Sequence, residues 1–256
     1  MIKATDIKKT FEDGQEVLKG ISVTFEKGKT NLIIGRSGAG KTVLLKILVG
    51  LIDPSSGNVW YNGDNFFDLN KKQRRAIRME VGMLFQGSAL FDSMSTEENI
   101  RFPLDMFTNM TRKEKQKQVD YTLERVELVG ANKKYPSEIS GGMQKRVGIA
   151  RSIVLNPKYL FCDEPNSGLD PKTSLLIDEL IKRITYENEM TTIINTHDMN
   201  SVMEIGDNIV LLHNGELAWQ GNKSEVLNNE NQLLQDFIFA SPFLQRLRAA
   251  ALQNTK

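Results

Sequence analysis

The stretch GRSGAGKT, Gly35 to Thr42, follows the apolar run TNLII and precedes the helical run VLLKILVGL. It matches the pattern G-x-x-x-x-G-K-[ST] in the strand–loop–helix setting that this pattern requires. Small residues let successive main-chain N–H groups converge on phosphate oxygens, Lys41 supplies a point charge for the β- and γ-oxygens, and the Thr42 hydroxyl can bind Mg²⁺. The alternative, a glycine-rich turn without a ligand, is disfavoured by this setting, so the sequence predicts a nucleotide-binding loop. The residues expected around the phosphates are Gly35, Arg36, Ser37, Gly38, Ala39, Gly40, Lys41, Thr42 and Val43.

Two adjacent carboxylates end another apolar run, YLFCDEP, Tyr159 to Pro165. Asp163 is expected to hold Mg²⁺ through water, as the acidic residue after the second strand does in P-loop NTPases. Glu164 is not expected to bind the metal and can polarise the attacking water as a general base. Such a base typically raises the reaction rate about 10²–10⁴-fold. An idle, solvated acid pair is the alternative, and a phosphate-binding loop in the same chain makes it less attractive. Cys162 is expected to be an apolar filler of the strand.

Three further residues are candidates for the same site. Gln86 ends the run VGMLF, and its neutral amide can bind Mg²⁺ and sense the γ-phosphate. His197 follows the run TTIIN, where an imidazole can contact the γ-phosphate or the water. Phe11 can stack on adenine, with packing in the core as an equal alternative. His213, in an expected hairpin strand, is interpreted as structural.

A second glycine-rich helix start occurs at EISGGMQKRVGIARSI, Glu138 to Ile153. Ser is a good helix N-cap and Gly a poor interior residue, so we expect the helix to begin near Ser140. Gly141 and Gly142 leave its first N–H groups bare, which makes an anion site. The chain therefore carries two candidate anion sites, and one nucleotide does not explain both.

Composition narrows the class of protein. The net charge of +1 argues against a broad nucleic-acid-binding surface, so no nucleic acid is expected as a partner. A single cysteine is consistent with a reducing compartment. The first residues have no apolar core typical of a secretory signal, and no apolar run is long enough to span a bilayer. We expect a cytoplasmic protein, with peripheral attachment to a membrane left open.

The order of patterns along the chain predicts an α/β protein with a helical insert. Short β segments with turns fill the first sixty residues, including a turn at Asn62-Gly63. The character is helical from about Ser88 to Val154, with a capping box at Thr111 and Glu114 and one apolar face. Strands return after Pro157, and the last is a hairpin around Asn214-Gly215.

The motifs GRSGAGKT, Gln86, ISGGMQKR, YLFCDEP, SGLD and THD occur here in the order found in ATP-binding-cassette (ABC) ATPases. The chain resembles this family over nearly all of residues 1–220. The resemblance implies a P-loop NTPase (RecA-like) core with an antiparallel β subdomain and an inserted α-helical subdomain, and ATP with Mg²⁺ as ligands. It implies an ABC ATPase domain at 1–220, a helical insert at about 88–154 and a C-terminal helical extension at 221–256.

The resemblance also explains the second anion site. In this family two ATPase domains pair head to tail, and each ATP lies between the P-loop of one and the signature helix of the other. A homodimer is therefore expected, in which Ser140, Gly141 and Gly142 contact the nucleotide of the other copy. The loop ending at Asp170 is similar to the family's segment that touches its counterpart across the interface. The metal ligands implied are Thr42, Gln86 and Asp163.

The segment VGMLFQGSALFDSMSTEENIRFPL is similar to the ATPase subunits of Mla/Mce-type phospholipid transporters. There it is the place where a permease would dock, and Phe85, Ala89, Leu90, Phe91 and Met94 offer an apolar surface. The alternative is that these residues pack inside the insert. The resemblance implies an ATPase on the cytoplasmic face of the inner membrane, powering phospholipid transport for outer-membrane lipid asymmetry. The partners implied are multi-span permease subunits and an Mce-type lipid-binding, membrane-anchored subunit.

Other functions compete with this interpretation. The ATPase of a small-solute importer, for example of methionine or another amino acid, has a similar segment after the Gln. A soluble, non-transport cassette protein and a P-loop kinase are less favoured, because the chain has one P-loop, no heptad run and a signature helix that a kinase does not need. The basic tail SPFLQRLRAAALQNTK is expected to dock on a partner or lie near anionic lipid, with a frayed end as the alternative.

Overall fold

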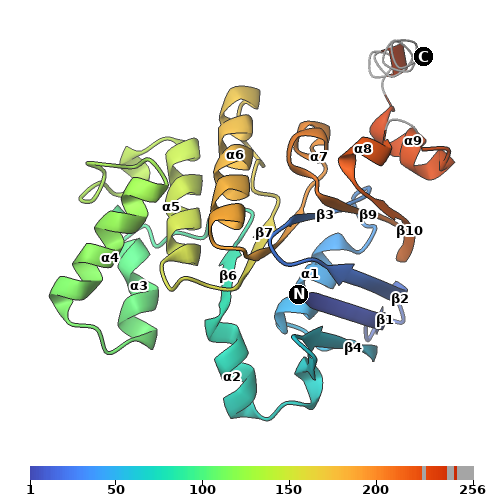
Figure 1. The fold of residues 1–256 in the computed structure, drawn as a ribbon, viewed down its shortest axis with the longest axis horizontal. Coiled ribbons are helices and arrows are strands. Elements are labelled where there is room, and N and C mark those ends of the chain that lie inside the picture. Colours follow the sequence, from blue (N-terminus) through green and yellow to red (C-terminus); the bar gives the residue numbers. More distant parts are fainter. Residues whose placement is uncertain (227–228, 241–244, 247–256) are drawn as a thin grey trace. The chain divides into compact units, whose positions relative to one another are not determined.

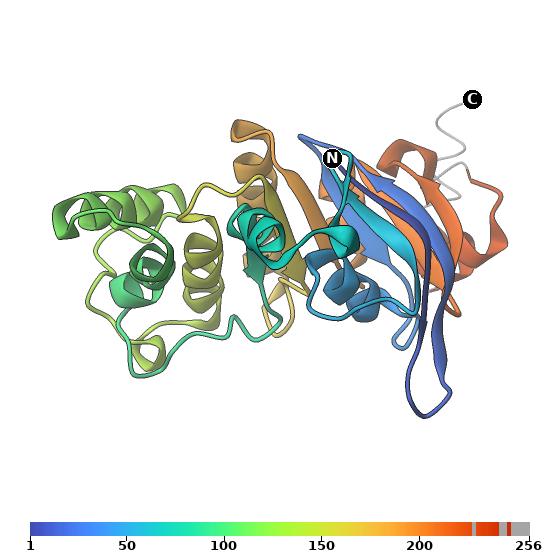
Figure 2. The same cartoon turned by 90° about the horizontal axis from the view of Figure 1, so that it is seen from below.

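The computed structural model describes residues 1–226, 229–240 and 245–246. The chain forms two compact units. The first consists of Met1–Glu26, Thr30–Asp68 and the residues from Asn195 onward, and the second of Lys27–Lys29 and Leu69–Ile194. Figures 1 and 2 show the ribbon from two directions.

An antiparallel sheet in the order β2-β1-β4-β5 belongs to the first unit. It is formed by β1 (Ile2–Thr10), β2 (Glu16–Phe25), β4 (Ser56–Tyr61) and β5 (Asp64–Asn65). Ile2, Ala4 and Ile7 of β1 are fully buried while Lys3 is exposed, as expected for a sheet with one covered face. The β4–β5 turn has φ of 51° at Asn62 and 102° at Gly63, which confirms the predicted hairpin.

The loop with the predicted nucleotide-binding motif, residues 35–42, belongs to this unit. Its strand β3 (Thr30–Ile34) runs parallel to β9 (Asn208–His213), and β9 pairs antiparallel with β10 (Glu216–Gly221). All five residues of β3 are buried, as in parallel strands covered on both faces. The helices of this unit are α1 (Lys41–Val49), α7 (Met199–Ile205), α8 (Lys223–Val226) and α9 (Gln232–Ile238), with a short 3-10 helix at Phe66–Asp68.

The second unit joins three strands to five α-helices within the described residues. Its strands lie in the order β8-β7-β6, and β6 (Val81–Leu84) and β7 (Tyr159–Asp163) run parallel. The third, β8, spans Thr191–Asn195. The helices are α2 (Lys71–Met79), α3 (Thr96–Phe107), α4 (Arg112–Arg125), α5 (Gly141–Ile153) and α6 (Pro171–Glu187), with a 3-10 turn at Pro136–Glu138.

Helices α3, α4 and α5 pack against one another, and Figure 1 shows them as a separate group of green and yellow-green coils. The capping box predicted at Thr111 and Glu114 begins α4. Val119, Leu123 and Val126, its predicted apolar face, are at most 2% exposed. The fold class is therefore confirmed: an α/β P-loop core with an antiparallel β part and a helical part.

The structure differs from the sequence prediction at two places. Helix α2 was not anticipated, because KKQRRAIRM buries no residue; a capping box between Asn70 and Gln73 begins it. The insert is also not helical from Ser88: Ser88 and Ala89 have φ of 61° and 47°, and α3 begins only at Thr96. Left-handed φ at two successive residues is incompatible with a right-handed helix.

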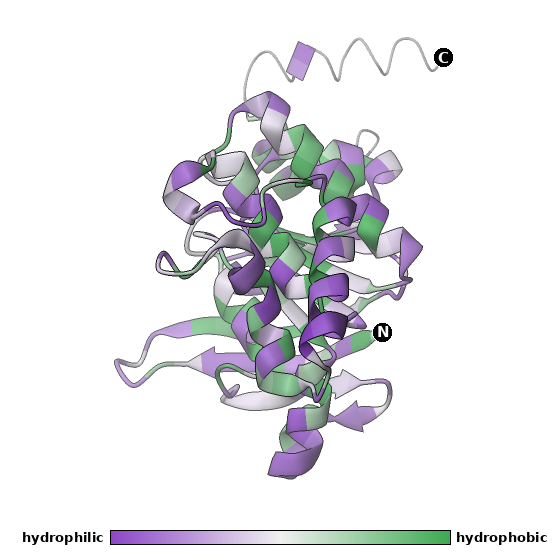
Figure 3. Ribbon diagram, turned by 90° about the vertical axis from the view of Figure 1, so that its left-hand side faces the viewer, coloured by the Kyte–Doolittle hydropathy of each residue, from purple (hydrophilic) through white to green (hydrophobic). Residues whose placement is uncertain are grey.

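The C-terminal region forms the short helices α8 and α9 within the described residues. The expected apolar face of Phe243, Leu244, Leu247 and Leu252 lies outside the described residues. Hydrophilic and hydrophobic residues alternate along the helices in Figure 3, and none of the described helices is long and apolar enough to cross a membrane.

Candidate nucleotide-binding site

The loop between β3 and α1 adopts a shape that only glycine can supply at its key positions. Gly35, Gly38 and Gly40 have φ of 145°, 79° and 98°. A Cβ on Gly35 would lie 2.4 Å from the carbonyl oxygen of Leu212, and one on Gly40 would lie 2.6 Å from Cδ2 of Leu18. The loop is thus held close to its neighbours within the first unit, as a cradle for phosphate requires.

Lys41 is positioned inside this loop. The residue is 8% exposed, and its Nζ donates to the carbonyl oxygens of Gly35 at 2.8 Å and Arg36 at 3.2 Å. Gly40, the N-cap of α1, has no side chain to satisfy the first N–H groups of the helix. A cation and a bare helix N-terminus therefore converge at one place, which favours a phosphate group.

The other two candidates of the first unit are accessible. His197 is exposed just after β8. Phe11 is 39% exposed, and Nζ of Lys9 lies 5.2 Å from the centre of its ring. Packing of Phe11 in the core, the alternative left open by the sequence, is wrong, because the residue lies in the turn between β1 and β2. Its ring is available to a flat base.

The acid pair ends β7 in the second unit. Asp163 is buried, with 9% of its surface exposed, and Glu164 is half-buried. Glu164 has φ of 52°, uncommon for a residue other than glycine, and such conformations concentrate at functional sites. Cys162 is fully buried, and burial raises the pKa of its thiol far above the ordinary value, so it is an apolar filler as expected.

Gln86 lies beside the segment that follows the acid pair. Its side-chain Nε2 donates to Oγ of Ser167 at 3.4 Å, and its main-chain carbonyl oxygen accepts from Nζ of Lys145 on α5. The structure therefore brings together Gln86 and the start of the SGLD segment, which are far apart in the sequence.

Helix α5 begins where the sequence predicted. Ser140 is its N-cap and accepts from N of Met143 at 3.3 Å, and both Ser140 and Gly141 are exposed. A Cβ on Gly142 would lie 2.6 Å from Cγ2 of Thr173, so the helix start packs closely on α6. The bare N–H groups thus face solvent on a surface that has no room for a larger residue at Gly142.

Asp170 acts within its own chain as the N-cap of α6. Its carboxylate accepts from N of Thr173 at 3.0 Å and from the Thr173 hydroxyl. These hydrogen bonds lower the pKa of Asp170. Thr173 therefore contacts both Asp170, the last residue of the SGLD segment, and Gly142.

The donor set suits Mg²⁺ bound with a nucleotide. No group of three or more His, Cys, Asp or Glu residues gathers in a metal-ligand arrangement among the described residues. Mg²⁺ commonly takes only one or two protein oxygens beside substrate phosphates and water, so a closed cage is not required. Oxygen donors of the suitable type are present at Thr42 in the first unit and at Gln86 and Asp163 in the second.

A groove of 720 Å³ lies within the second unit. It is lined in part by residues 85–95, the segment between β6 and α3 that contains Gln86 and is called the Gln86 loop below. Four phenylalanines line it: Phe85, Phe91, Phe102 and Phe107. Three arginines, Arg75, Arg78 and Arg151, also line it, and no carboxylate is among its lining residues.

Phe85 and Phe91 are 43% and 40% exposed, and Ala89 is exposed, so the alternative that they pack inside the insert is wrong. Leu90 and Met94 are half-buried.

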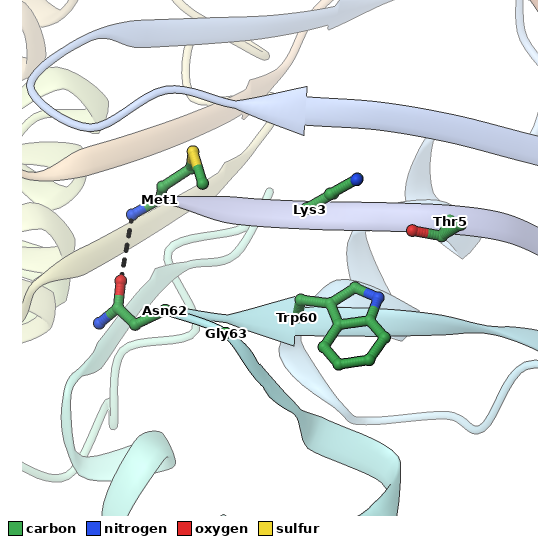
Figure 4. A pocket seen from close by; sticks show the side chains of 6 residues that line it. All are labelled: Met1, Lys3, Thr5, Trp60, Asn62 and Gly63. Atoms are coloured by element: carbon green, nitrogen blue, oxygen red, sulfur yellow. Dashed lines mark hydrogen bonds between the residues drawn. The ribbon is translucent and has the colours of Figure 1, made fainter.

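A smaller hollow of 350 Å³ lies on the antiparallel sheet, between β1 and the end of β4 (Figure 4). The amino group of Met1 donates to Oδ1 of Asn62 at 3.5 Å, and both residues line the hollow together with Trp60. Lys3 is its one charged side chain. It lacks the convergent main-chain donors of the β3–α1 loop, which is therefore the better phosphate site.

Two residues that hold the Gln86 loop were missed from the sequence. Lys145 and Arg151, both on α5, donate to carbonyl oxygens of that loop. The signal was present for Lys145, because it lies two residues before Val147 and five after Ser140, at a position that α5 buries. A lysine on the covered side of a helix needs a partner.

Comparison with known proteins decides the family. The family model described as ABC transporter matches residues 18–167, more than half of the chain. The chain belongs to the ABC transporter family. Its phosphate-binding loop, acid pair and α5 start are therefore parts of an ABC ATPase, and the chain is the ATPase subunit of an ABC transporter.

Curated relatives of this ABC ATPase carry different substrate names. It is 37% identical over 229 residues to the methionine import ATP-binding protein MetN 1 of Pseudomonas putida, covering 88% of this chain and 68% of that protein. It is 35% identical over 240 residues to the probable ribonucleotide transport ATP-binding protein mkl of Mycobacterium bovis, covering 93% and 66%.

Solved structures of ABC cassettes share its fold. The dimeric post-hydrolysis structure of the ATP-binding cassette MJ0796 bound to ADP and Pi has a TM-score of 0.79 and 30% identity, covering 87% of this chain and 99% of that chain. The structure of cbiO1 from Clostridium perfringens, part of the ABC transporter complex cbiONQ, has a TM-score of 0.83 and 30% identity, covering 96% and 97%.

Proposed function

We propose that this ABC ATPase works as a homodimer bound to a membrane permease and powers phospholipid transport. The observation that carries the transporter part is the groove beside the Gln86 loop. It is apolar, open and rimmed by arginines, and the same loop contacts the segment after the acid pair. A partner in the groove would thus touch the same loop as the hydrolysis machinery.

Head-to-tail pairing is supported by the exposed start of α5. Ser140 and Gly141 present a hydroxyl and bare N–H groups to solvent, although the chain already has a complete phosphate cradle at Lys41. A second copy gives these donors a ligand, the γ-phosphate of its own ATP. Pairing of identical chains uses both such sites at once. A relative of similar fold has been solved as a dimer with ADP and Pi.

We assign the chemistry as follows. The P-loop from Gly35 to Val43 binds the phosphates, with Lys41 neutralising the β- and γ-oxygens and Phe11 stacking on the base. Glu164 takes the proton of the attacking water, and His197 and Gln86 orient the γ-phosphate and that water. Mg²⁺, when bound, supplies charge neutralisation between the phosphates, and Thr42, Gln86 and Asp163 would hold it.

The permease segment that fits the groove is an amphipathic helix with an acidic residue. Phe85, Phe91, Phe102 and Phe107 offer apolar contact to one face of such a helix. Arg75, Arg78 and Arg151 favour a carboxylate at its edge, because arginine forms bidentate bonds with carboxylates. Bound in this way, the ATPase would lie peripherally on the cytoplasmic face of the inner membrane.

Phospholipid is the substrate we favour, from the similarity of residues 83–104 to the ATPases of Mla/Mce-type phospholipid transporters. In that case an Mce-type membrane-anchored subunit is a further partner, and transport serves outer-membrane lipid asymmetry. Import of a small solute is the second candidate, and it is supported by the names of relatives at 35–37% identity.

Purification from native membranes separates these candidates. The affinity-tagged chain is expected to bring down a multi-span permease with bound phospholipid, detected by mass spectrometry of the lipid extract. Phe85→Asp combined with Phe91→Asp should lose the permease, whereas Tyr121→Asp, on α4 outside the groove, should keep it. An amino-acid-binding protein in the complex, without enriched lipid, would instead support the importer.

The proposed base has its own test. Glu164→Gln keeps the shape of the site but cannot take a proton, so turnover should fall about 100-fold or more. ATP binding should persist, and the variant should accumulate as a closed dimer on size-exclusion chromatography with ATP. Turnover close to that of the native chain would remove Glu164 as the base.

A further inference from the structure

Helix α5 holds the loop after β6 through three main-chain carbonyls. Lys145 donates its Nζ to the carbonyl oxygen of Gln86. Arg151 donates its Nη2 to the carbonyl oxygen of Ser88 at 2.7 Å and its Nη1 to that of Ala89 at 2.8 Å. The loop conformation needs such support, because Ser88 and Ala89 have left-handed φ, which is unfavourable for residues other than glycine.

Lys145 is the unusual member of this set because its charge is buried. Only 5% of the residue is exposed, so its ammonium group must find partners inside the protein. Burial lowers the pKa of Lys145. The ammonium hydrogen-bonds the main chain of Gln86, within one unit of the chain.

We propose that Lys145 is a positioning residue for ATP hydrolysis, which fixes the main chain of Gln86 from the signature helix. The proposal rests on the proposed function, in which Gln86 orients the γ-phosphate and the attacking water. Lys145 does not touch the nucleotide in this role. It acts through the hydrogen bond that holds the main chain of Gln86 in place.

The position of Lys145 gives this role a mechanical consequence. Ser140, Lys145 and Arg151 lie on the same helix, so its N-terminus, the Gln86 loop and one wall of the groove move together. A partner that displaces the groove wall would shift the Gln86 carbonyl. The helix therefore links occupancy of the groove to the rate of hydrolysis.

Three substitutions separate the charge of Lys145 from its hydrogen bond. Lys145→Met removes both, Lys145→Gln keeps a donor without the charge, and Lys145→Arg keeps both. Lys117→Met, an exposed lysine on α4, is the matched control. We would measure phosphate release by the full chain at saturating MgATP, the KM for ATP, and the thermal unfolding midpoint of each variant.

The expected result is a loss in kcat with little change in KM. Lys145→Met should lower kcat roughly tenfold or more, since removal of a buried charged donor typically costs more than 1.4 kcal/mol. Lys145→Gln should lose part of kcat, because a neutral donor forms a weaker hydrogen bond than a charged one. Lys145→Arg should keep most of the native kcat, because it keeps a charged donor, and Lys117→Met should match the native chain throughout.

Two results would overturn the inference. One is a kcat of Lys145→Met within about twofold of the native value in a folded chain. The other is an equal loss in all three variants, Lys145→Arg included, since that pattern marks a structural role alone. If Lys145→Met does not fold, Lys145→Gln carries the test, because its amide can still donate to Gln86.

Gln86→Ala, assayed in parallel, distinguishes failure of the inference from failure of the proposed function. If Gln86→Ala retains turnover, the role assigned to Gln86 in the proposed function is wrong, and the inference falls with it. If Gln86→Ala loses turnover while Lys145→Met does not, only the inference falls. In Gln86→Ala the additional Lys145→Met change should have little further effect on kcat, because the side chain that it positions is already gone.

Discussion

The chain has two glycine-rich helix starts, and they use glycine for opposite reasons. At α1 the glycines supply backbone shape: Gly35, Gly38 and Gly40 have φ between 79° and 145°. At α5, Gly141 and Gly142 do not have left-handed φ, and Gly142 supplies space, because a Cβ there would meet Thr173. The first start holds its own buried cation, Lys41, whereas the second faces solvent with Ser140 as its cap.

The contrast shows how one chain divides a catalytic site. The loop before α1 carries everything needed to bind phosphate alone: main-chain donors, a charge and a bare helix N-terminus. The start of α5 has hydrogen-bond donors but no cation. We therefore expect it to contribute hydrogen bonds to a phosphate that another element already binds. Substitutions at the first start should therefore affect binding, and those at the second should affect turnover.

The largest expected effect is at Lys41. Lys41→Ala removes the cation of the P-loop, and loss of a charged hydrogen-bond donor of about 3 kcal/mol corresponds to roughly 100-fold weaker ATP binding or more. Isothermal titration calorimetry of the full chain measures this. Lys46→Ala, an exposed lysine on the same helix, is the control. Micromolar ATP affinity in Lys41→Ala would contradict the cradle.

Substitutions at Ser140 distinguish its role as the N-cap of α5 from a role in phosphate binding. Ser140→Asp keeps a good N-cap, so stability should be retained, but its negative charge repels phosphate and turnover should fall roughly tenfold or more. Ser140→Ala loses the cap and should lower the free energy of unfolding by about 1 kcal/mol. Urea unfolding and phosphate release, measured on both variants, test this. Full turnover in Ser140→Asp would mean that no phosphate approaches this helix.

Gly142 tests the distinction between space and shape directly. Gly142→Ala should lower turnover, and Thr173→Ser, which removes the Cγ2 methyl group but keeps the hydroxyl bonded to Asp170, should restore it. Gly38→Ala meets no atom within 4 Å but requires φ of 79°, so no trimming of a neighbour should rescue it. Phosphate release by the single and double variants measures both. Failure of Thr173→Ser to rescue would show that Gly142 is needed for another reason.

The smallest expected effect is on how the free energy of unfolding depends on pH, through the ion pairs of Glu127 near the end of α4. Arg146 and Arg183 hydrogen-bond Glu127 at 2.8 and 3.0 Å and lower the pKa of its carboxyl below the ordinary 4.5. Because the folded pKa is lowered, this contribution is present above pH 4.5 and is lost as the pH falls below it.

Glu127 is more than half exposed, so solvent screening keeps the contribution below about 1 kcal/mol. Urea unfolding at pH 7 should show Glu127→Gln slightly destabilised, and the difference should shrink at pH 4. Glu124→Gln, at an exposed position of α4, is the control. A difference that grows on acidification would have the wrong sign for this ion pair.

Local patterns were predictable where neighbouring residues alone decide the structure. The strand–loop–helix around Lys41, the cap at Ser140 and the hairpins at Asn62-Gly63 and Asn214-Gly215 follow from backbone preferences over a few residues. Helix α2 escaped prediction because it has no buried face, and a period of apolar residues is the main sequence signal for a helix.

Contacts between distant segments were not predictable from these patterns. The packing of Gly142 on Thr173 and the bonds from Lys145 and Arg151 to the Gln86 loop join residues that only folding brings together. The exposure of Phe85 and Phe91 could not be predicted for the same reason. The sequence does not show whether an aromatic side chain packs inward or lines a groove.

The sequence by itself determined that this chain binds a nucleotide, since phosphate chemistry needs particular residue types at short, fixed spacing. It also determined the α/β class through the periods of its apolar residues. Only the tertiary structure decided which groups share a site: that Gln86 contacts Ser167, that a buried lysine of α5 holds the Gln86 carbonyl, and that phenylalanines and arginines form one groove. Spacing along the chain records local geometry, whereas burial and charge pairing depend on segments that meet only in the folded protein.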